Sequence, residues 1–434
     1  MKSFIINFFY HQKNILKVNT LNYKKLLENK INLLKKEHRY RIFVELERLP
    51  EKNPKALWHT NKKTNEVTVW CSNDYLGMSQ NKDVIKKVNQ AILKYGVGAG
   101  GTRNISGTST SIVALEKLLS KIHNKEKSII FTSGYVANET SISTLIKLLN
   151  NPVVFSDELN HASIISGIQK NKDYLAKVIF KHNNITDLEN KLKQFPLERH
   201  KIIIFESVYS MSGSISPIEE IVKLSKKYNC LTYLDEVHAV GMYGEKGGGV
   251  AQEMNLENEI DIIQGTLAKA YGAVGGYIAS NELICDAIRS YGSGFIFTSA
   301  LPPALLEGAL FSVRHLKFSS MERTNQRKNV KLLKDKLINK SIPFINNNSH
   351  IIPIIVGDSK QCSEISYKLL EEYKIYIQPI NYPTVPRGTE RLRITPGPFH
   401  SEEMIDYLAL ALKNIFEEFQ PISYLQYNNK LNAI

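Results

Sequence analysis

Residues 261–272, DIIQGTLAKAYG, join a short apolar run to a turn that contains one lysine, Lys269. Stretches with a helical pattern, such as DVIKKVNQAILKYG, alternate with apolar runs of this kind. Four other apolar runs end in small or polar residues: SIIFTSG, PVVFSDE, KIIIFESVYS and CLTYLDEVH. Apolar strands spaced by helices indicate a parallel sheet covered on both faces. We therefore predict an α/β fold in which ligands bind at the carboxyl ends of the strands.

A second pattern begins near residue 313, where a helical stretch is followed by shorter strands. SHIIPIIVGD, KIYIQPINYP and RLRITPGP read as strands, and an amphipathic helix follows them. This order predicts a small α+β domain. Residues 21–47 read as a helix of mixed charge, and TVWCSNDYLG as a strand with a polar turn. The expected organisation is an extension of unknown role over residues 1–20, an N-terminal segment over 21–75, a large domain over 76–312 and a small domain over 313–434.

The bulk composition indicates a folded chain with a basic surface. Of the 434 residues, 43% are hydrophobic, which is enough for two or three structural lobes. The formal charge of +14 permits an anionic partner, but the excess is spread along the chain rather than clustered. The four cysteines form no C-x-x-C pair, so we expect neither a zinc site nor a disulfide framework. Apolar runs fall short of the ~18 residues that span a bilayer, so we expect no membrane span.

Two motifs suggest nucleotide chemistry and lack the context that it requires. GVGAGG, residues 96–101, matches G-x-G-x-x-G but follows a helical stretch instead of a strand. We interpret it as a glycine-rich loop that passes close to a ligand. LTYLDEVHAVG resembles the acidic motif of helicases, yet the chain contains no Gly-Lys dipeptide for a phosphate-binding loop. The sequence therefore does not support a nucleic-acid motor.

Lys269 allows two interpretations, because a buried ammonium is costly. The lysine either lies on a surface turn or works as a neutral amine that forms a Schiff base. Asp235 ends one apolar run, His238 lies three residues further on, and Lys269 follows the next run, so all three could meet at one edge of the sheet. A carboxylate, an imidazole and a lysine around a cleft suit pyridoxal phosphate, whose pyridine nitrogen the carboxylate keeps protonated. Taken singly, Asp235 could equally be a strand-end cap and His238 a core histidine.

From about Lys35 to Phe419 the chain resembles the pyridoxal-phosphate-dependent α-oxoamine synthases. The resemblance rests on CSNDYLGM, GGTRNISGT, FTSGYVAN, SDELNHASII, FESVYSMSG, YLDEVHAVGMYG, GTLAKAYGAVGGYIA, GFIFTSALPP and INYPTVPRGTERLRITPGP. It implies the aspartate-aminotransferase type of fold, fold type I, with a large, mostly parallel α/β domain and a smaller α+β C-terminal domain. It also implies a homodimer with active sites at the subunit interface.

The resemblance assigns roles around the cofactor. Lys269 would hold pyridoxal phosphate as a Schiff base and move protons at the substrate carbon. Asp235 would pair with the pyridinium nitrogen, and His161 would stack on the ring. The remaining assignments are His238 and Ser210 at the phenolate oxygen, Gly134, Tyr135 and Thr266 at the phosphate, and Thr298 at the phosphate from the partner subunit.

The resemblance also assigns the substrate residues. Arg393 would clamp the glycine carboxylate, although Arg391 points the same way in an extended strand and the residue pattern cannot separate the two. Arg41 would meet the succinyl carboxylate, and relatives that take alkyl or acetyl groups do not need this cation. The family usually has Gly where this chain has His38. The remaining substrate residues would be Asn73, Thr102, Asn104 and Thr384.

The implied reaction condenses glycine with succinyl-CoA to give 5-aminolevulinate, CoA and carbon dioxide, the first step of haem and tetrapyrrole biosynthesis. One alternative is a sibling enzyme that uses another acyl-CoA, such as 2-amino-3-ketobutyrate CoA ligase. A nucleic-acid-binding protein is the other, but it would need clustered Lys and Arg with interleaved aromatics, which the chain lacks. We expect a bacterial cytoplasmic enzyme, or a mitochondrial matrix enzyme if residues 1–20 belong to a transit peptide.

Overall fold

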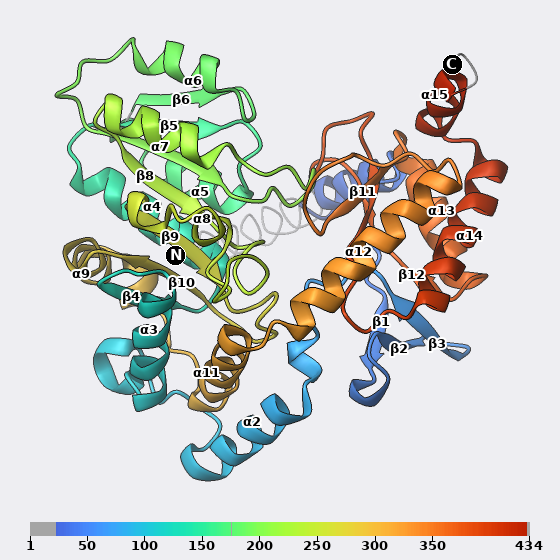
Figure 1. Ribbon diagram of the computed structural model, residues 1–434, viewed down its shortest axis with the longest axis horizontal. Coiled ribbons are helices and arrows are strands. Elements are labelled where there is room, and N and C mark those ends of the chain that lie inside the picture. Colours follow the sequence, from blue (N-terminus) through green and yellow to red (C-terminus); the bar gives the residue numbers. More distant parts are fainter. Residues whose placement is uncertain (1–22, 175, 432–434) are drawn as a thin grey trace, which may run out of the picture.

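The computed structural model describes residues 23–174 and 176–431, and a seven-stranded sheet forms the core of its large domain, on the left in Figure 1. In spatial order its strands are β4 (Lys127–Phe131), β10 (Gly276–Ser280), β9 (Ile262–Thr266), β8 (Leu231–Asp235), β7 (Lys201–Glu206), β5 (Val153–Asp157) and β6 (Ala176–Phe180). Strand β10 runs antiparallel to both neighbours, and the other pairs are parallel. The structure confirms the α/β fold and the five strands expected from the sequence. Strands β6 and β10 were not predicted.

Helices cover both faces of this sheet, because alternate side chains of each strand point to opposite faces. On β7, Ile203 and Phe205 belong to one core cluster, whereas Ile202 and Ile204 belong to the other. The first cluster includes side chains of α3 (Thr110–Ile122), α6 (Ile185–Leu192), α7 (Ile218–Lys227), α8 (Val250–Glu253) and α11 (Pro303–Phe318). The second includes side chains of α4 (Gly134–Leu148), α5 (Ala162–Gln169) and α9 (Glu282–Tyr291), with α10 (Ser293–Ile296) nearby.

The C-terminal domain has its own core and a three-stranded antiparallel sheet. The sheet consists of β11 (Ile352–Ile355), β14 (Arg391–Ile394) and β13 (Pro379–Ile380). The helices are α12 (Met321–Asn339), α13 (Ser359–Glu371), α14 (Glu402–Phe419) and α15 (Ile422–Leu431). A second sheet joins the two ends of the chain, because β12 (Ile375–Tyr376) pairs with β3 (Thr64–Val69), which continues through β2 (Lys55–His59) to β1 (Glu45–Arg48). Figure 1 shows β1, β2 and β3 beside the C-terminal domain.

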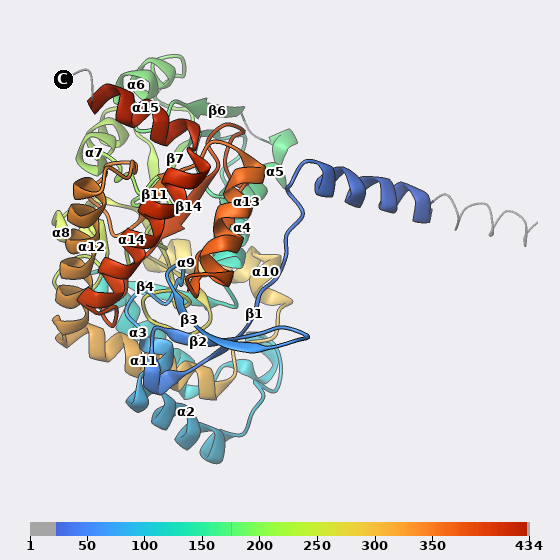
Figure 2. The same cartoon turned by 90° about the vertical axis from the view of Figure 1, so that its right-hand side faces the viewer.

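The helix expected over residues 21–47 is shorter in the structure. The described helix ends at residue 36, and residues 45–48 form β1, so the prediction was wrong beyond that point. His38 has a φ of 54°, a left-handed conformation that cannot continue a right-handed helix. The helix over residues 23–36 extends away from the body of the molecule (Figure 2). The extension over residues 1–20 lies outside the described residues.

The expected change of domain after residue 312 falls within α11. This helix packs lengthwise on α2 (Lys82–Tyr95), where a Cβ atom at Gly308 would lie 2.7 Å from Val88 Cγ2. We propose that the domains meet in the turn after Phe318. The GVGAGG segment follows α2, as expected, and Gly96 adopts a φ of 81°.

Among the described residues, no helix is both long and apolar enough to span a membrane. The same residues contain no cluster of three or more potential metal ligands. All four cysteines are free thiols.

Candidate active site

The carboxyl ends of the parallel strands carry a row of acidic residues. Asp157 ends β5, Glu206 ends β7 and Asp235 ends β8, and Glu206 is paired in register with Asp235. All three residues are buried. Lys269 follows β9, the next strand in the sheet. The fold therefore brings one amine to an edge rich in carboxylates.

Lys269 is a weakened base. Burial lowers the pKa of its amine from 10.5 to about 8, Asp235 and Glu206 oppose this shift, and Arg393 reinforces it. The amine therefore lies close enough to these groups to feel their charge. This environment differs from the solvated surface turn that the sequence left open, and it suits a lysine that reacts as a free amine.

Asp235 is held at both carboxylate oxygens. Oδ2 accepts a hydrogen bond from Asn138 Nδ2 at 2.7 Å, and Oδ1 accepts one from the Val237 amide at 2.8 Å. Burial raises the pKa of this carboxyl. Within the described residues no cationic side chain forms an ion pair with it. A buried carboxylate that is oriented in this way favours a cationic ligand.

His238 is linked to Arg393 through one phenol. The Tyr75 hydroxyl lies 2.7 Å from His238 Nδ1 and accepts a 2.7 Å hydrogen bond from Arg393 Nη2. Burial, reinforced by Lys269 and Arg393, lowers the pKa of His238 well below its usual value. The ring is therefore neutral near pH 7, and its Nε2 atom is left for another partner.

The structure distinguishes Arg393 from Arg391. Arg393 donates from Nε to Ser210 O at 2.7 Å and from Nη1 to Asn73 Oδ1 at 3.2 Å, so all its partners are neutral oxygens. Arg391 donates to the carbonyls of Thr389 and Met211. Only Arg393 contributes to the lowered pKa of Lys269. A buried guanidinium beside the lysine without a carboxylate partner is suited to a substrate carboxylate.

His161 caps the N-terminus of α5. Its Nδ1 atom accepts a hydrogen bond from the Ser163 amide at 3.2 Å, and its own amide donates to Glu206 Oε1 at 2.6 Å. Burial and the charge of Asp235 raise the pKa of Glu206 well above its usual value. The residue as a whole is exposed. The backbone of this histidine is therefore fixed while its ring remains accessible.

The N-terminus of α4 forms an anion-binding cradle. The Gly134 and Tyr135 amides lie in the first turn, and Ser133 caps the helix by accepting from the Val136 amide at 3.1 Å. A Cβ atom at Gly134 would lie 3.5 Å from Thr266 Oγ1. A Cβ atom at Gly276 would lie only 2.4 Å from Gly134 N. Glycine at position 276 therefore keeps the amides clear.

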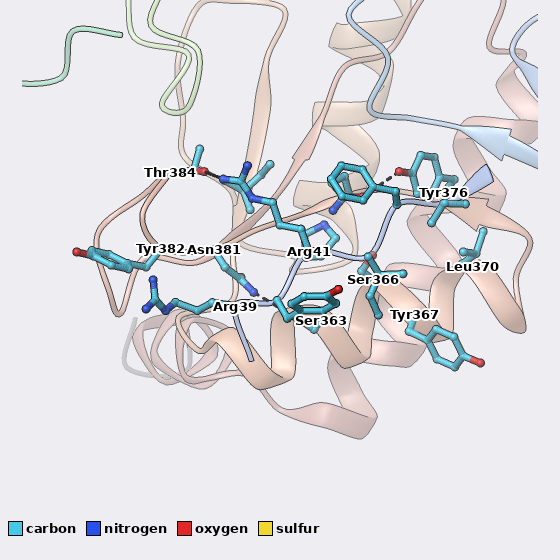
Figure 3. Close-up of a pocket in the computed structure, with 17 residues that line it drawn as sticks. Arg39, Arg41, Ser363, Ser366, Tyr367, Leu370, Tyr376, Asn381, Tyr382 and Thr384 are labelled. Carbon is cyan, nitrogen blue, oxygen red and sulfur yellow. Dashed lines mark hydrogen bonds between the residues drawn. The ribbon is translucent and has the colours of Figure 1, made fainter. Parts of the chain in front are cut away.

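Arg41 and Thr384 form a separate group (Figure 3). Arg41 Nη2 donates to Thr384 Oγ1 at 3.3 Å, and both residues line a cavity of about 560 Å³. The residues that line this cavity do not include Lys269, Asp235 or Arg393. In the described chain the Arg41 group is thus distinct from the lysine site.

Thr102, Asn104 and Thr298 make a third group. Thr102 pairs with Ser299 in an isolated antiparallel bridge, which places it next to Thr298. Asn104 is exposed in the short π-helix that follows, η3 (Arg103–Gly107). Within the described residues, no side-chain hydrogen bond joins these three residues to the lysine site.

A family model described as aminotransferase class I and II matches residues 65–412. A 5-aminolevulinate synthase of Rickettsia bellii is 50% identical over 394 residues, which cover 91% of this chain and 94% of the relative. One of Rhizobium meliloti is 51% identical over 396 residues, 91% of this chain and 98% of the relative. The chain belongs to the 5-aminolevulinate synthase family. Among solved structures, a serine palmitoyltransferase from S. paucimobilis with a bound PLP-myriocin aldimine has a TM-score of 0.84 and 28% identity, and the match covers 92% of this chain and 99% of that chain.

Sequence reasoning missed several residues that organise this member of the 5-aminolevulinate synthase family. Tyr75 connects His238 with Arg393, Asn138 orients Asp235, and Glu206 holds the backbone of His161. Tyr75 and Asn138 lie within stretches that supported the resemblance, but their partners are distant in sequence. Glu206 ends an apolar strand, and that position was the available signal.

Proposed function

We propose that this protein condenses glycine with succinyl-CoA to form 5-aminolevulinate, CoA and carbon dioxide. The observation that carries the proposal is the juxtaposition of a half-buried lysine and a buried arginine. Lys269 has a pKa lowered to about 8, and Arg393 stands beside it without a carboxylate partner. A reaction at the α-carbon of an amino acid needs a base at that carbon and a clamp for the carboxylate.

The site fits pyridoxal phosphate on three grounds. The α4 cradle, kept open by Gly276, suits a phosphate, and the oriented Asp235 suits a protonated pyridine nitrogen. Lys269 supplies an amine that is weakly basic and can form the covalent link. When bound, the cofactor supplies an electron sink for negative charge at the α-carbon.

Lys269 is the group that moves protons at the glycine α-carbon. As a free amine it takes one α-proton, and a new bond joins that carbon to the succinyl carbonyl carbon while the CoA thiolate leaves. The carboxyl group of glycine then departs as carbon dioxide, and Lys269 returns a proton to the same carbon. A lysine with a pKa near 8 is suited to both directions of transfer near neutral pH.

Three further residues orient these groups. Arg393 binds the glycine carboxylate as a bidentate pair. His238 would offer its Nε2 atom to the ring oxygen of the cofactor, Ser210 would assist it, and His161 would cover the ring face. These roles are supported by the contact of Tyr75 with His238 Nδ1, by the contact of Arg393 with Ser210 O and by the exposure of His161.

Selectivity for the acyl group rests on Arg41. We propose that this guanidinium, assisted by Thr384, binds the terminal carboxylate of the succinyl group, and that Asn73, Thr102 and Asn104 complete the acyl site. The hydrogen bond between Arg41 and Thr384 supports a shared role. Because that group is separate from Lys269 in the described chain, binding of the acyl substrate requires the two groups to be brought together.

We propose a homodimer in which Thr102, Asn104 and Thr298 serve the active site of the other subunit. In the described part of one chain, no side-chain hydrogen bond ties these residues to Lys269, Asp235 or Arg393. Thr298 lines a small cavity with Phe131 and Thr132, and that lining does not include the lysine, which supports this assignment. The curated relatives named above are bacterial, which supports a bacterial cytoplasmic enzyme. The mitochondrial alternative depends on residues 1–20, which lie outside the described part.

The test combines an absorbance spectrum of the purified protein with pyridoxal phosphate and assays with two acyl donors. We expect a bound-cofactor band and 5-aminolevulinate from glycine and succinyl-CoA, with acetyl-CoA a poor donor. Turnover of acetyl-CoA in preference to succinyl-CoA would assign a sibling activity. Failure to bind the cofactor would contradict the proposal altogether.

A further inference from the structure

Residues 208–215 form a tight hairpin on the large domain, called here the 208–215 hairpin. Val208 and Ile215 pair in an antiparallel bridge at its base. The Tyr209 amide donates to Ser214 O at 3.0 Å, and the Gly213 amide donates to Tyr209 O at 2.9 Å. These bonds make the hairpin a compact unit whose tip, residues 210–213, carries Ser210.

The tip of the 208–215 hairpin is bound by the small domain through three consecutive carbonyls. The donors are Arg393 Nε to Ser210 O at 2.7 Å, Arg391 Nη1 to Met211 O at 3.0 Å, and Asn347 Nδ2 to Ser212 O at 3.0 Å. The approach is close, because a Cβ atom at Gly213 would lie 2.5 Å from Asn347 Nδ2. The position of the tip therefore sets the position of the Arg393 guanidinium.

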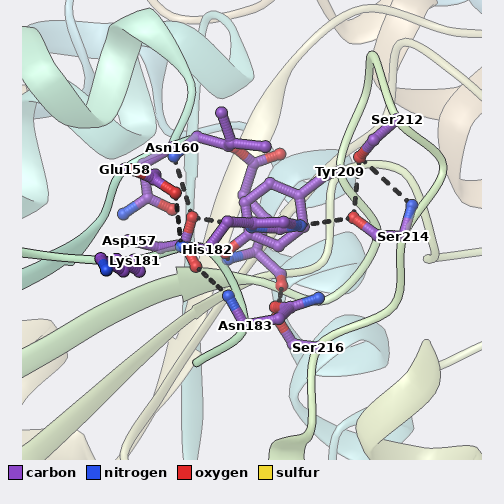
Figure 4. Close-up of polar contacts among 12 residues, drawn as sticks. Asp157, Glu158, Asn160, Lys181, His182, Asn183, Tyr209, Ser212, Ser214 and Ser216 are labelled. Carbon is purple, nitrogen blue, oxygen red and sulfur yellow. Dashed lines mark hydrogen bonds and ion pairs between the residues drawn. The ribbon is translucent and has the colours of Figure 1, made fainter. Parts of the chain in front are cut away.

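On the large-domain side, His182 holds the 208–215 hairpin (Figure 4). His182 Nδ1 lies 2.9 Å from Asp157 Oδ1, and its Nε2 lies 2.7 Å from Ser214 Oγ. A carboxylate only accepts, so His182 Nδ1 carries the hydrogen in its contact with Asp157, and Nε2 is the ring atom that contacts the Ser214 hydroxyl. The side chain of Asp157 is 1% exposed, and its Oδ2 also accepts from the Asn183 amide.

The order of Asp157, His182 and Ser214 matches that of a nucleophilic triad, but its surroundings indicate a structural clamp. Ser214 Oγ also lies 2.7 Å from Ser212 Oγ within the same hairpin. The His182 ring packs edge-on against Tyr209, with centroids 4.4 Å apart. The serine and the ring are thus engaged by the hairpin itself.

We propose that His182 is a positioning residue for glycine binding, acting through Ser214 and the 208–215 hairpin on Arg393. Asp157 orients the His182 ring through Nδ1, His182 contacts the hairpin at Ser214, and the carbonyl of Ser210 accepts from Nε of Arg393. This inference rests on the proposed function only in assigning Arg393 to the glycine carboxylate.

The test uses Ser214→Ala in the holoenzyme. This change removes the hydroxyl that contacts His182 Nε2 and leaves the His182–Asp157 pair intact. We expect the KM for glycine to rise roughly fivefold, the factor that one hydrogen bond of typical net strength supplies. The KM for succinyl-CoA and the affinity of the apoprotein for pyridoxal phosphate should stay unchanged. Ser214→Thr, which keeps the hydroxyl, should restore the glycine KM.

Two further variants separate positioning from general destabilisation. Ser128→Ala removes a buried serine hydroxyl that donates to Glu116 O at 2.7 Å, away from the hairpin, and should leave the glycine KM unchanged. His182→Phe keeps the aromatic contact with Tyr209 and should raise the glycine KM, and adding Ser214→Ala to it should raise the KM little further. An unchanged glycine KM in folded Ser214→Ala, or an equal rise in Ser128→Ala, would overturn the proposal.

Hydrogen exchange of residues 208–216 in the cofactor-free protein provides a readout that is independent of turnover. We expect faster exchange of these amides in Ser214→Ala than in the wild type and in Ser128→Ala. If the wild type makes no 5-aminolevulinate, the proposed function fails. The hydrogen-exchange rates of residues 208–216 then remain as the test of whether His182 and Ser214 hold the hairpin. Unchanged exchange across the hairpin would then contradict it.

Discussion

The lowered pKa of Lys269 means that this residue reduces the free energy of unfolding when no cofactor is bound. Between about pH 8 and 10.5 the unfolded chain binds a proton at this lysine that the folded chain lacks. The free energy of unfolding therefore rises with pH across that window, and the full penalty applies below it. Burying the amine thus exchanges stability for reactivity.

Lys269→Met is predicted to stabilise the cofactor-free protein at neutral pH. The methionine keeps most of the side-chain volume and removes the charge, so the gain should be roughly 3 kcal/mol. The gain should shrink as pH rises from about 8 towards 10.5, where the wild-type amine is neutral in both states. Urea unfolding of both apoproteins across this range measures it. A difference that does not change with pH would show that the amine is already solvated.

Arg393→Lys and Arg391→Lys are predicted to differ sharply. Lysine cannot reproduce a bidentate pair, so Arg393→Lys should raise the KM for glycine about 30-fold or more, the equivalent of a charged hydrogen bond of about 2 kcal/mol. Arg391 donates only to backbone carbonyls among the described residues, so Arg391→Lys should change the KM for glycine only a few-fold. Steady-state kinetics with varied glycine measures the KM of both variants. Similar increases in the two variants would contradict the assignment of Arg393 alone to the glycine carboxylate.

At the scale of single elements, strand β10 closely approaches the start of α4, where we propose that the phosphate binds. Gly276 on β10 lies directly under the Gly134 amide. The turn at His38 shows a related constraint, because its φ of 54° lies in the left-handed region that glycine adopts most readily. Histidine is one of the non-glycine residues that adopt this region more often than most.

Gly276→Ala is predicted to weaken cofactor binding. The added methyl group would lie 2.4 Å from Gly134 N, and overpacking of this kind costs roughly 2 kcal/mol, or about 30-fold in affinity. Fluorescence titration of the apoprotein with pyridoxal phosphate measures the change. Gly98→Ala is the control, because a Cβ atom there meets nothing within 4 Å. Equal affinities of the two variants for pyridoxal phosphate would show that the phosphate does not bind at the N-terminus of α4.

For the whole molecule, we propose that a complete site needs two chains, because no side-chain hydrogen bond among the described residues ties Thr102, Asn104 or Thr298 to Lys269. The lysine site gathers residues from both domains, since Arg393 comes from the small domain. The Thr102 group remains on another part of the large domain. A monomer would then hold an incomplete site.

Subunit mixing is predicted to restore activity. Lys269→Ala and the triple variant Thr102→Ala, Asn104→Ala, Thr298→Ala should each be nearly inactive alone. After unfolding and refolding together, mixed dimers should contain one intact site each, giving about a quarter of wild-type activity for random pairing. The absence of restored activity in mixtures whose dimers are shown to have exchanged would place the triple group in the same subunit as Lys269.

The sequence by itself determined the parallel core of this protein, because uninterrupted apolar runs between helical stretches can be satisfied only by a sheet buried on both faces. It also identified Lys269, Asp235 and His238 as neighbours, since strand ends meet at one edge. The edge strand β6 and the antiparallel β10 escaped detection because AKVIF and GYIAS are short and carry no pattern beyond local hydrophobicity. The end of the first helix was not predicted, because it depends on the left-handed conformation of a single residue, His38.

Only the tertiary structure could separate Arg393 from Arg391, because two residues on the same face of a strand differ in nothing but their distant partners. It alone revealed the link through Tyr75 and the hold of His182 on the 208–215 hairpin, which join residues far apart in the chain. It also decided the pKa of Lys269, since burial and the surrounding charges are properties of the folded molecule. The local sequence pattern limits which residues can lie at the same edge of the sheet. Long-range packing determines which of those residues contact one another.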